Sequence, residues 1–271
     1  FTQDLTMNLT RLIRGASATL ALAMAAFTAS AAPTTQLGFL IDASGSIGTS
    51  NFTTMKNGYA AALGALPTDG SIEVTIYSFS TGTVQVLAPT VVTGASIGGI
   101  ISAVNGMAYT AGTTHTADGI NAIAAAMLGS ANYSAQLRSI INIATDGVPN
   151  GNTQAQTIAA ATSAQTRGID AMTAEAIGAG LDVGFLQDIV FSPVKGVCTN
   201  CGVVLPGVGS LSDPMTSDPW ILRVNTFADF EDAITAKVKA ITNQVPEPGS
   251  VALVAIALLA AGGQARRSRK A

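Results

Sequence analysis

The chain has 271 residues, of which 48% are hydrophobic and 11% charged, and its formal net charge is −3. Six of the thirteen basic residues lie near the two ends, so residues 32–244 hold seven basic and fourteen acidic residues, a net charge of −7. An acidic middle argues against nucleic-acid binding through phosphate neutralisation. One histidine and two cysteines exclude a zinc site built from several histidines or from four cysteines.

The first 31 residues have the features of a secretory signal peptide. Two arginines precede an almost entirely apolar run over residues 15–27, and Ala29-Ser30-Ala31 forms a small-residue cleavage site. The apolar run is too short to span a bilayer comfortably. We therefore expect export with cleavage after Ala31, and residues 1–6 are interpreted as an upstream extension.

Strand-like and helix-like stretches alternate through the middle of the chain. The patterns predict strands over residues 36–41, 71–80, 83–92, 139–145, 170–177 and 219–224. They predict helices over residues 52–66, 95–104, 116–128, 154–167, 181–190 and 227–241. Lys237 and Lys239 fall late in the last helix, where cations complement the helix dipole.

This alternation predicts one α/β domain over residues 32–244. The expected architecture is a doubly wound, mostly parallel sheet, covered by helices on both faces and carrying one antiparallel edge strand from a hairpin. Residues 194–217 are rich in glycine, proline and serine and hold both cysteines, so we expect a loop insertion before the last strand.

Oxygen-bearing side chains gather where two of the expected strands end. Asp42, Ser44 and Ser46 follow the first strand, Asp146 follows the strand over 139–145, and Thr114 begins the helix between them. Because the carboxyl ends of parallel strands share one edge of a sheet, we expect these side chains to meet there. Such hard oxygen donors suit Mg²⁺ or Mn²⁺ and not zinc or copper. Taken alone, the Asp-x-Ser-x-Ser segment would also fit a helix cap.

The three segments, in this order, resemble the von Willebrand factor A domain, which includes the integrin I domain. The resemblance covers about residues 36–242 and implies a metal-ion-dependent adhesion site. Within it, Ser44, Ser46 and Thr114 would supply hydroxyls, and Asp42 and Asp146 would bind directly or through water. Only two carboxylates leave the cation electrophilic at an open position, where a carboxylate of a protein or polysaccharide partner could bind.

Residues 245–271 have three parts: Pro246-Glu247-Pro248, an apolar stretch over 251–263, and a basic end. Residues 249–265 are just long enough to cross a thinned hydrocarbon core, with the basic cluster left in the cytoplasm. This tail resembles the PEP-CTERM sorting signal. The resemblance implies an exosortase partner, transient anchoring in the inner membrane, and a final place on the surface or in the matrix of a Gram-negative bacterium. Hydropathy alone would also fit a plain C-terminal anchor.

Two enzymatic readings compete with the binding module. Ser96 lies in a Gly-x-Ser-x-Gly segment, but a hydrolase needs a later acid and then a later histidine, and the single His115 comes too soon. Cys198 and Cys201 could form a redox dithiol, although their loop-like surroundings and an oxidising exterior favour a local disulfide. We therefore expect a binding protein and no enzyme. The alternative is a structural matrix protein that a metal stabilises, with a hydrolase or thiol oxidoreductase as the less favoured choice.

Overall fold

The structure is a computed structural model that describes residues 32–178, 181 and 183–242. The expected signal peptide over residues 1–31 lies outside the described residues. So does the expected sorting tail over residues 245–271, with Pro246, Glu247 and Pro248.

A single seven-stranded sheet forms the centre of the domain, in the order β3-β2-β1-β4-β5-β7-β6. The strands are β1 (Thr35–Asp42), β2 (Asp69–Phe79), β3 (Thr83–Thr93), β4 (Arg138–Thr145), β5 (Ala171–Ile177), β6 (Val203–Leu205) and β7 (Trp220–Val224). All neighbouring strands run parallel except β2 and β3, which form the antiparallel hairpin at one edge. The predicted fold class, a doubly wound and mostly parallel sheet with one antiparallel edge strand, is confirmed.

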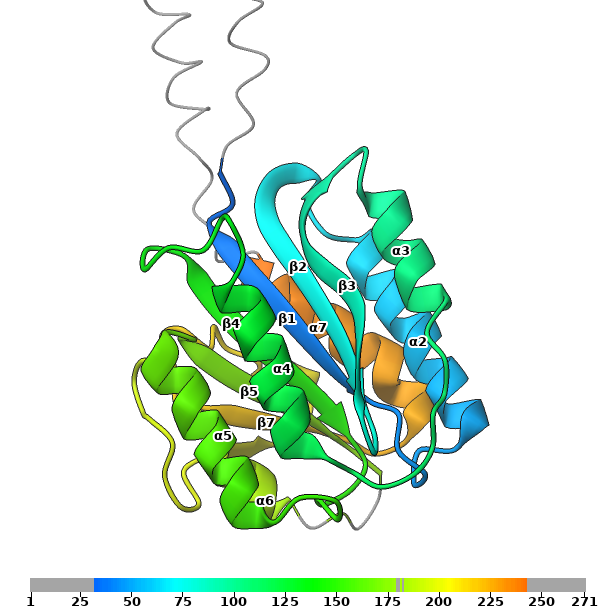
Figure 1. The fold of residues 1–271 in the computed structure, drawn as a ribbon, viewed down its shortest axis with the longest axis vertical. Helices are drawn as coiled ribbons and strands as arrows, with labels where there is room; N and C mark the ends of the chain where they lie inside the picture. Colours follow the sequence, from blue (N-terminus) through cyan, green and yellow to red (C-terminus); the bar gives the residue numbers. More distant parts are fainter. Residues whose placement is uncertain (1–31, 179–180, 182, 243–271) are drawn as a thin grey trace, which may run out of the picture.

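Helices cover both faces of this sheet (Figure 1). They are α2 (Thr49–Gly64), α3 (Ile97–Asn105), α4 (Thr116–Leu128), α5 (Gln154–Arg167), α6 (Gly184–Gln187) and α7 (Phe230–Thr242), with short 3-10 turns η1 (Val208–Ser210) and η2 (Phe227–Asp229). One hydrophobic core lies under α2, α3 and α7, and a second lies under α4, α5 and α6. None of the helices in the described ranges combines the length and the hydropathy that crossing a membrane requires.

Two glycines let α4 approach the sheet closely. A Cβ atom on Gly38 of β1 would collide with the Met127 sulfur, and one on Gly119 of α4 would press against Leu40 and Phe79. Interiors are packed too densely to absorb such overlaps without displacement. The close approach brings the first turn of α4 to the carboxyl edge of the sheet, where Thr114 is expected to act.

The segment before the last strand differs from the prediction. Residues 194–217 were expected to be a loop insertion, but Val203–Leu205 form β6, which pairs in parallel with β7 and makes the second edge of the sheet. Three residues are too few to produce a periodic pattern, so only the pairing partner reveals the strand. The helix expected over 181–190 is shorter and spans Gly184–Gln187. Beyond this helix, Phe191 forms an isolated antiparallel bridge with Met172 of β5.

A buried ion pair connects α7 to the sheet. Lys237 and Glu175 of β5 are both completely buried, and their Nζ and Oε1 atoms are 2.5 Å apart. Lys237 also donates to the amide oxygen of Asn142 in β4, and its Nζ lies 4.9 Å from the centroid of the Trp220 ring. Burial lowers the pKa of Lys237, while the Glu175 carboxylate acts in the opposite direction. Lys237 is therefore an internal partner of Glu175, whereas Lys239 stays exposed.

The two ends of the described domain lie at the same end of the molecule. The Arg138 backbone N–H, at the start of β4, donates to the Thr34 carbonyl, and its side chain donates to the Ile241 carbonyl. Residues 34 and 241 therefore both contact Arg138 at the amino ends of β1 and β4, opposite the carboxyl edge of the sheet.

Removing one member of the buried ion pair should destabilise the domain strongly. We expect Lys237→Ala to lower the free energy of unfolding by about 3–5 kcal/mol, because Glu175 is left as an uncompensated buried charge. Lys237→Met combined with Glu175→Leu should recover most of this loss, since no charge remains inside. Urea unfolding measures both, with Lys239→Ala on the exposed side of α7 as the matched control. An equal, small effect of Lys237→Ala and Lys239→Ala would contradict the assignment.

Candidate functional site

Three loops at the carboxyl edge of the sheet carry the predicted site residues. We name them the first loop (residues 42–48, after β1), the second loop (residues 109–116, before α4) and the third loop (residues 145–152, after β4). β1 and β4 are neighbours in the sheet, with Ile41 paired to Ala144, so the first and third loops leave the sheet side by side. The second loop reaches them by packing against the first.

The first loop folds around the carboxylate of Asp42. The backbone N–H of Ser44 donates to Asp42 Oδ1 at 2.8 Å, and the hydroxyls of Ser44 and Ser46 are 3.2 Å apart. Asp42 and Ser44 are completely buried, whereas Ser46 is exposed. The loop therefore presents the Asp42 carboxylate and the Ser44 hydroxyl in the interior and the Ser46 hydroxyl at the surface.

The third loop completes this set of oxygens. The Ser46 hydroxyl donates to Asp146 Oδ1 at 2.7 Å, which links the first loop to the third across the gap between β1 and β4. The Thr145 hydroxyl donates to Asp42 Oδ2 at 2.6 Å. Thr145 was not among the predicted site residues. The sequence did contain a signal for Thr145, because this residue ends β4 and directly precedes Asp146.

The second loop is pressed against the first in a restricted backbone conformation. Gly45 N–H donates to the Gly112 carbonyl at 2.9 Å, and the Tyr109 hydroxyl donates to the Gly45 carbonyl at 3.2 Å. Gly112 has φ +85° and Ala111 has φ +56°, a left-handed conformation that costs energy for a residue with a Cβ atom. A Cβ on Gly112 would also collide with the Thr81 hydroxyl.

Thr114 stands at the inner end of the second loop. Thr114 is 2% exposed, and its backbone N–H donates to Asn150 Oδ1 of the third loop at 2.7 Å. Hydrogen bonds connect Asp42, Ser44, Ser46 and Asp146 directly. Thr114 is connected to this group only indirectly, through backbone hydrogen bonds with the third loop. Asn150 was missed by sequence reasoning, because nothing in the sequence indicates which backbone group an asparagine in a loop will bind.

The two carboxylates of the site lie in unfavourable surroundings for negative charge. Burial raises the pKa of Asp42 to about 6, although hydrogen bonds from Ser44 and Thr145 oppose the rise and the nearby Asp146 adds to it. Burial also raises the pKa of Asp146. In residues 32–178, 181 and 183–242, no lysine, arginine or histidine forms an ion pair with either carboxylate. The negative charge of the pair is thus left without a protein cation.

The donor chemistry fits a hard divalent cation. The site offers two carboxylates and several hydroxyls, and Thr116, at the start of α4, has a buried hydroxyl with no hydrogen-bond partner. In the described part of the chain there is no cluster of three or more histidine, cysteine, aspartate or glutamate residues that could hold a metal. A set made mostly of neutral oxygens is one that magnesium or manganese accepts more readily than copper does.

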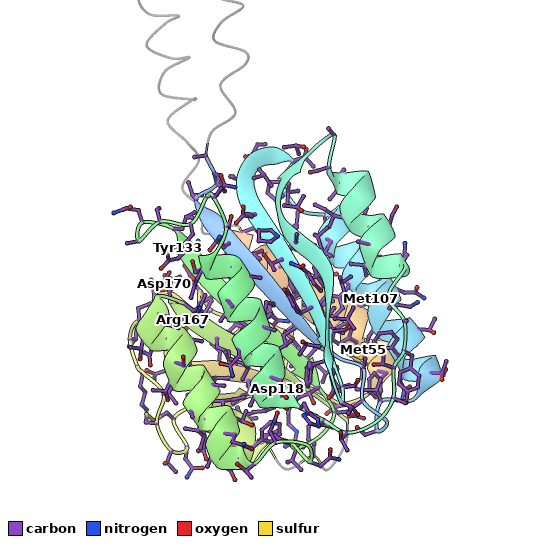
Figure 2. All side chains as sticks on the ribbon, in the orientation of Figure 1. Met55, Met107, Asp118, Tyr133, Arg167 and Asp170 are labelled. Atoms are coloured by element: carbon purple, nitrogen blue, oxygen red, sulfur yellow. A yellow bond between two sulfur atoms is a disulfide. The ribbon has the colours of Figure 1, made fainter. Side chains whose placement is uncertain are left out.

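Acidic groups elsewhere in the domain are separate from this site. Asp118, in the first turn of α4, lies near the site end of the molecule, whereas Asp170 and its neighbours Tyr133 and Arg167 lie at the opposite end (Figure 2). Asp118 Oδ2 is 3.0 Å from His115 Nδ1. Beside it, a shallow groove of about 340 Å³ runs between α4 and α5 and is lined by residues that include Asn152 and Gln156.

The residues behind the enzymatic readings are engaged elsewhere. The Ser96 hydroxyl donates to the Val91 carbonyl at 2.7 Å and accepts from the Thr93 backbone N–H at 2.8 Å, so it stabilises the turn that leads into α3. Cys198 and Cys201 form a disulfide. Their loop is held against α6, because the Asn200 N–H donates to Asp188 Oδ1 at 2.7 Å.

The stability of the metal-free protein should depend on the ionisation of Asp42. Its pKa in the folded state, about 6, lies above the ordinary value of 3.8. The folded state therefore binds the Asp42 proton more tightly than the unfolded state does. The stabilisation that this proton provides is complete below pH 3.8 and disappears as the pH rises through 6. Relative to Asp42→Asn, the wild type should lose roughly 2–3 kcal/mol between pH 4 and pH 7. Urea unfolding of both metal-stripped proteins measures the difference, and a difference that does not change with pH would contradict the burial of a charged Asp42.

Comparisons with solved structures find the same fold in proteins of distant sequence. Proximal thread matrix protein 1 from the mussel byssus superposes with a TM-score of 0.58 at 17% identity, over 77% of this chain and 48% of the mussel chain. A further structure of that protein is described as having a zinc-occupied MIDAS motif, the metal-ion-dependent adhesion site. The pilus adhesin SpaC from Lactobacillus rhamnosus GG gives 0.57 at 14% identity, over 78% of this chain and 30% of the adhesin.

A manganese-loaded TRAP protein from Plasmodium vivax gives a TM-score of 0.51 at 18% identity, over 77% of this chain and 74% of TRAP. At these identities the likeness concerns the fold alone. The chain spans about half the length of the mussel protein and less than a third of the adhesin. No curated protein sequence matches the chain.

The family model of the von Willebrand factor type A domain matches residues 36–200. This segment contains all three loops of the site and five of the seven strands. The chain therefore belongs to the von Willebrand factor type A domain family.

Proposed function

We propose that this protein is a cation-dependent adhesion module that captures an acidic group of its partner at the carboxyl edge of the sheet. One observation carries the proposal. Asp42 and Asp146 lie on adjoining loops, bridged by Ser46, and no basic side chain in the described ranges neutralises them. A bound cation would supply the missing positive charge.

Asp42, Ser44, Ser46, Thr114 and Asp146 would hold the cation, directly or through water. When bound, a divalent cation supplies an electrophilic position that attracts a carboxylate from a partner. The side chains of the domain have separate tasks. Thr145 orients Asp42 through its 2.6 Å hydrogen bond, and Ser46 orients Asp146. The site lacks an evident nucleophile with a general base, which supports binding rather than catalysis.

The metal is proposed to be Mg²⁺ or Mn²⁺. The oxygen-only donor set supports this choice, and a structurally similar protein, TRAP, is known in a manganese-loaded form. The zinc-occupied site of the mussel protein indicates that zinc must be included in any test, contrary to the expectation that the donor set would disfavour it.

The position of the two ends of the described domain supports display at a surface. Residues 34 and 241 both contact Arg138 at the end of the domain opposite the three loops. We propose that residues 1–31 direct export and that residues 245–271 are a PEP-CTERM tail processed by an exosortase. A domain of residues 32–244 tethered by this tail would direct its metal site away from the membrane of a Gram-negative cell and toward ligands in the surrounding matrix.

A structural matrix protein is the second candidate function. The similar mussel protein is named as a thread matrix protein, and in such a role the metal would stabilise the domain without capturing a partner. The two candidates differ in one measurable respect, because only an adhesion module binds a carboxylate partner in proportion to its metal occupancy.

Calorimetry on the purified full chain tests the metal site. We expect one Mg²⁺ or Mn²⁺ ion per chain and a higher melting temperature in its presence, because a ligand specific to the native state stabilises it by mass action. Asp42→Ala should abolish both effects, since it removes a charge and an oxygen together. Asp69→Ala is the matched control, because Asp69 lies at the amino end of β2. No bound cation at millimolar Mg²⁺, Mn²⁺ or Zn²⁺ would contradict the metal site and leave these side chains only the role of ordering the loops.

Surface binding to defined polymers tests adhesion. Poly-L-glutamate and polygalacturonate present carboxylates on a protein and on a polysaccharide backbone, and dextran is the uncharged control. We expect capture by at least one acidic polymer with cation present, and loss with chelator and with Asp42→Ala. Cation binding without capture by either acidic polymer would favour the structural role.

The tail is tested by mass spectrometry of protein released from the surface of the producing cells. We expect a mature chain that begins at Ala32 and lacks the basic residues 266–270, because the tail beyond Pro248 is removed. Released protein that retains Arg266 to Lys270 would contradict sorting by an exosortase and leave a plain anchor.

A further inference from the structure

We infer that Asn150 and Asn152 are positioning residues that clamp the second loop to the third, so that Thr114 and Asp146 act on one cation. The inference rests on the proposed metal site and extends it to residues that bind no metal themselves. Thr114 and Asp146 are far apart in the sequence and belong to different loops. A shared cation requires a fixed distance between them.

Asn150 holds the backbone of Thr114 from both sides. The Thr114 N–H donates to Asn150 Oδ1 at 2.7 Å. In the opposite direction, the backbone N–H groups of Asn150 and Gly151 donate to the Thr114 carbonyl at 3.3 and 3.2 Å. Both backbone polar groups of Thr114 are therefore bound to the third loop.

Asn152 caps the helix that follows. His115 occupies the N-cap position of α4 but makes no capping hydrogen bond with its side chain. Instead, the Ala117 N–H donates to Asn152 Oδ1 at 3.0 Å, and Asn152 Nδ2 lies 3.5 Å from Asp118 Oδ2. The free N–H groups of a helix start normally bind an oxygen close in sequence. Here the oxygen comes from the loop that carries Asp146, so the start of α4 and that loop move together.

Close packing reinforces the clamp. A Cβ atom on Gly151 would overlap the imidazole ring of His115, so the ring lies directly on the backbone of the third loop. The second loop is also restricted on its other side, where Gly45 N–H binds the Gly112 carbonyl. Thr114 is thus held between the first and the third loops by contacts that protein groups alone supply.

Such a clamp should raise metal affinity without supplying a ligand. Ordering a loop at the moment of binding subtracts from affinity, and partners that orient metal ligands are typically worth 10- to 100-fold in metal binding. Asn150→Ala removes the acceptor of the Thr114 N–H. Asn150→Asp keeps an oxygen at that position, so it should preserve the clamp.

The test compares cation binding by calorimetry on the full chain. We expect Asn150→Ala to weaken Mn²⁺ or Mg²⁺ binding about tenfold and Asn152→Ala to weaken it in the same direction. Asn150→Asp should bind the cation at least as tightly as the wild type does. The control is Asn121→Ala, the same substitution at an exposed position of α4, which should leave affinity unchanged. The Asn152 variant also keeps the test decisive if Asn150→Ala does not fold.

A second readout needs no metal. In the metal-free protein, amide hydrogen exchange at Thr114 should accelerate in Asn150→Ala but not in Asn150→Asp or Asn121→Ala. If wild type binds the cation and both alanine variants bind it equally well, the clamp is refuted while the metal site stands. If wild type binds no cation, the proposed function fails and the positioning role fails with it.

Discussion

The burial of two carboxylates without a cation of their own is the constraint on which the carboxyl edge of this domain depends. Asp42 is completely buried, and both its burial and the nearby Asp146 oppose its ionisation. Hydrogen bonds from Ser44 and Thr145 lessen that cost at Asp42, and the Ser46 hydroxyl donates to Asp146, but none of these groups carries a charge. An isolated carboxylate in such a place is expensive unless it is paired. The unbalanced charge supports the proposal that a cation from outside the protein completes the electrostatic balance of the site.

The same sheet contains a second buried carboxylate whose charge is paired with a cationic side chain. Glu175 is as deeply buried as Asp42, yet Lys237 of α7 lies against it, and Asn142 and Trp220 surround the ammonium group. There the charge is balanced internally, and the pair connects the last helix to the middle of the sheet. The contrast between an internally paired carboxylate and an unpaired one distinguishes the interior that stabilises the fold from the edge that is available to a ligand. It also explains why two acidic residues of similar burial have different expected responses to mutation.

The loops around the unpaired carboxylate are positioned by contacts with one another. The three loops are held in place by backbone hydrogen bonds, by glycines at Gly45 and Gly112, and by the asparagines of the third loop. Because these contacts join protein groups to one another, they restrict the loops independently of a cation, and a restricted loop has a smaller ordering cost on binding. The ends of the described domain lie at the opposite side of the sheet from the three loops, so the proposed tethering would not obstruct the site.

The residue pattern alone was sufficient to predict the α/β architecture, because hydrophobic periodicity is local and strands such as Thr35–Asp42 and helices such as Thr116–Leu128 are long enough to express it. It also singled out the side chains of the first loop and Asp146, since strand ends in a parallel sheet share an edge. It could not find β6, whose three residues become a strand only by pairing with β7, or the burial of Lys237, which the helix pattern alone placed at the dipole. Nor could it assign Asn150 and Asn152 to Thr114 and Ala117. Those partners are separated by more than thirty residues, and only the folded chain decides which polar groups come within hydrogen-bonding distance.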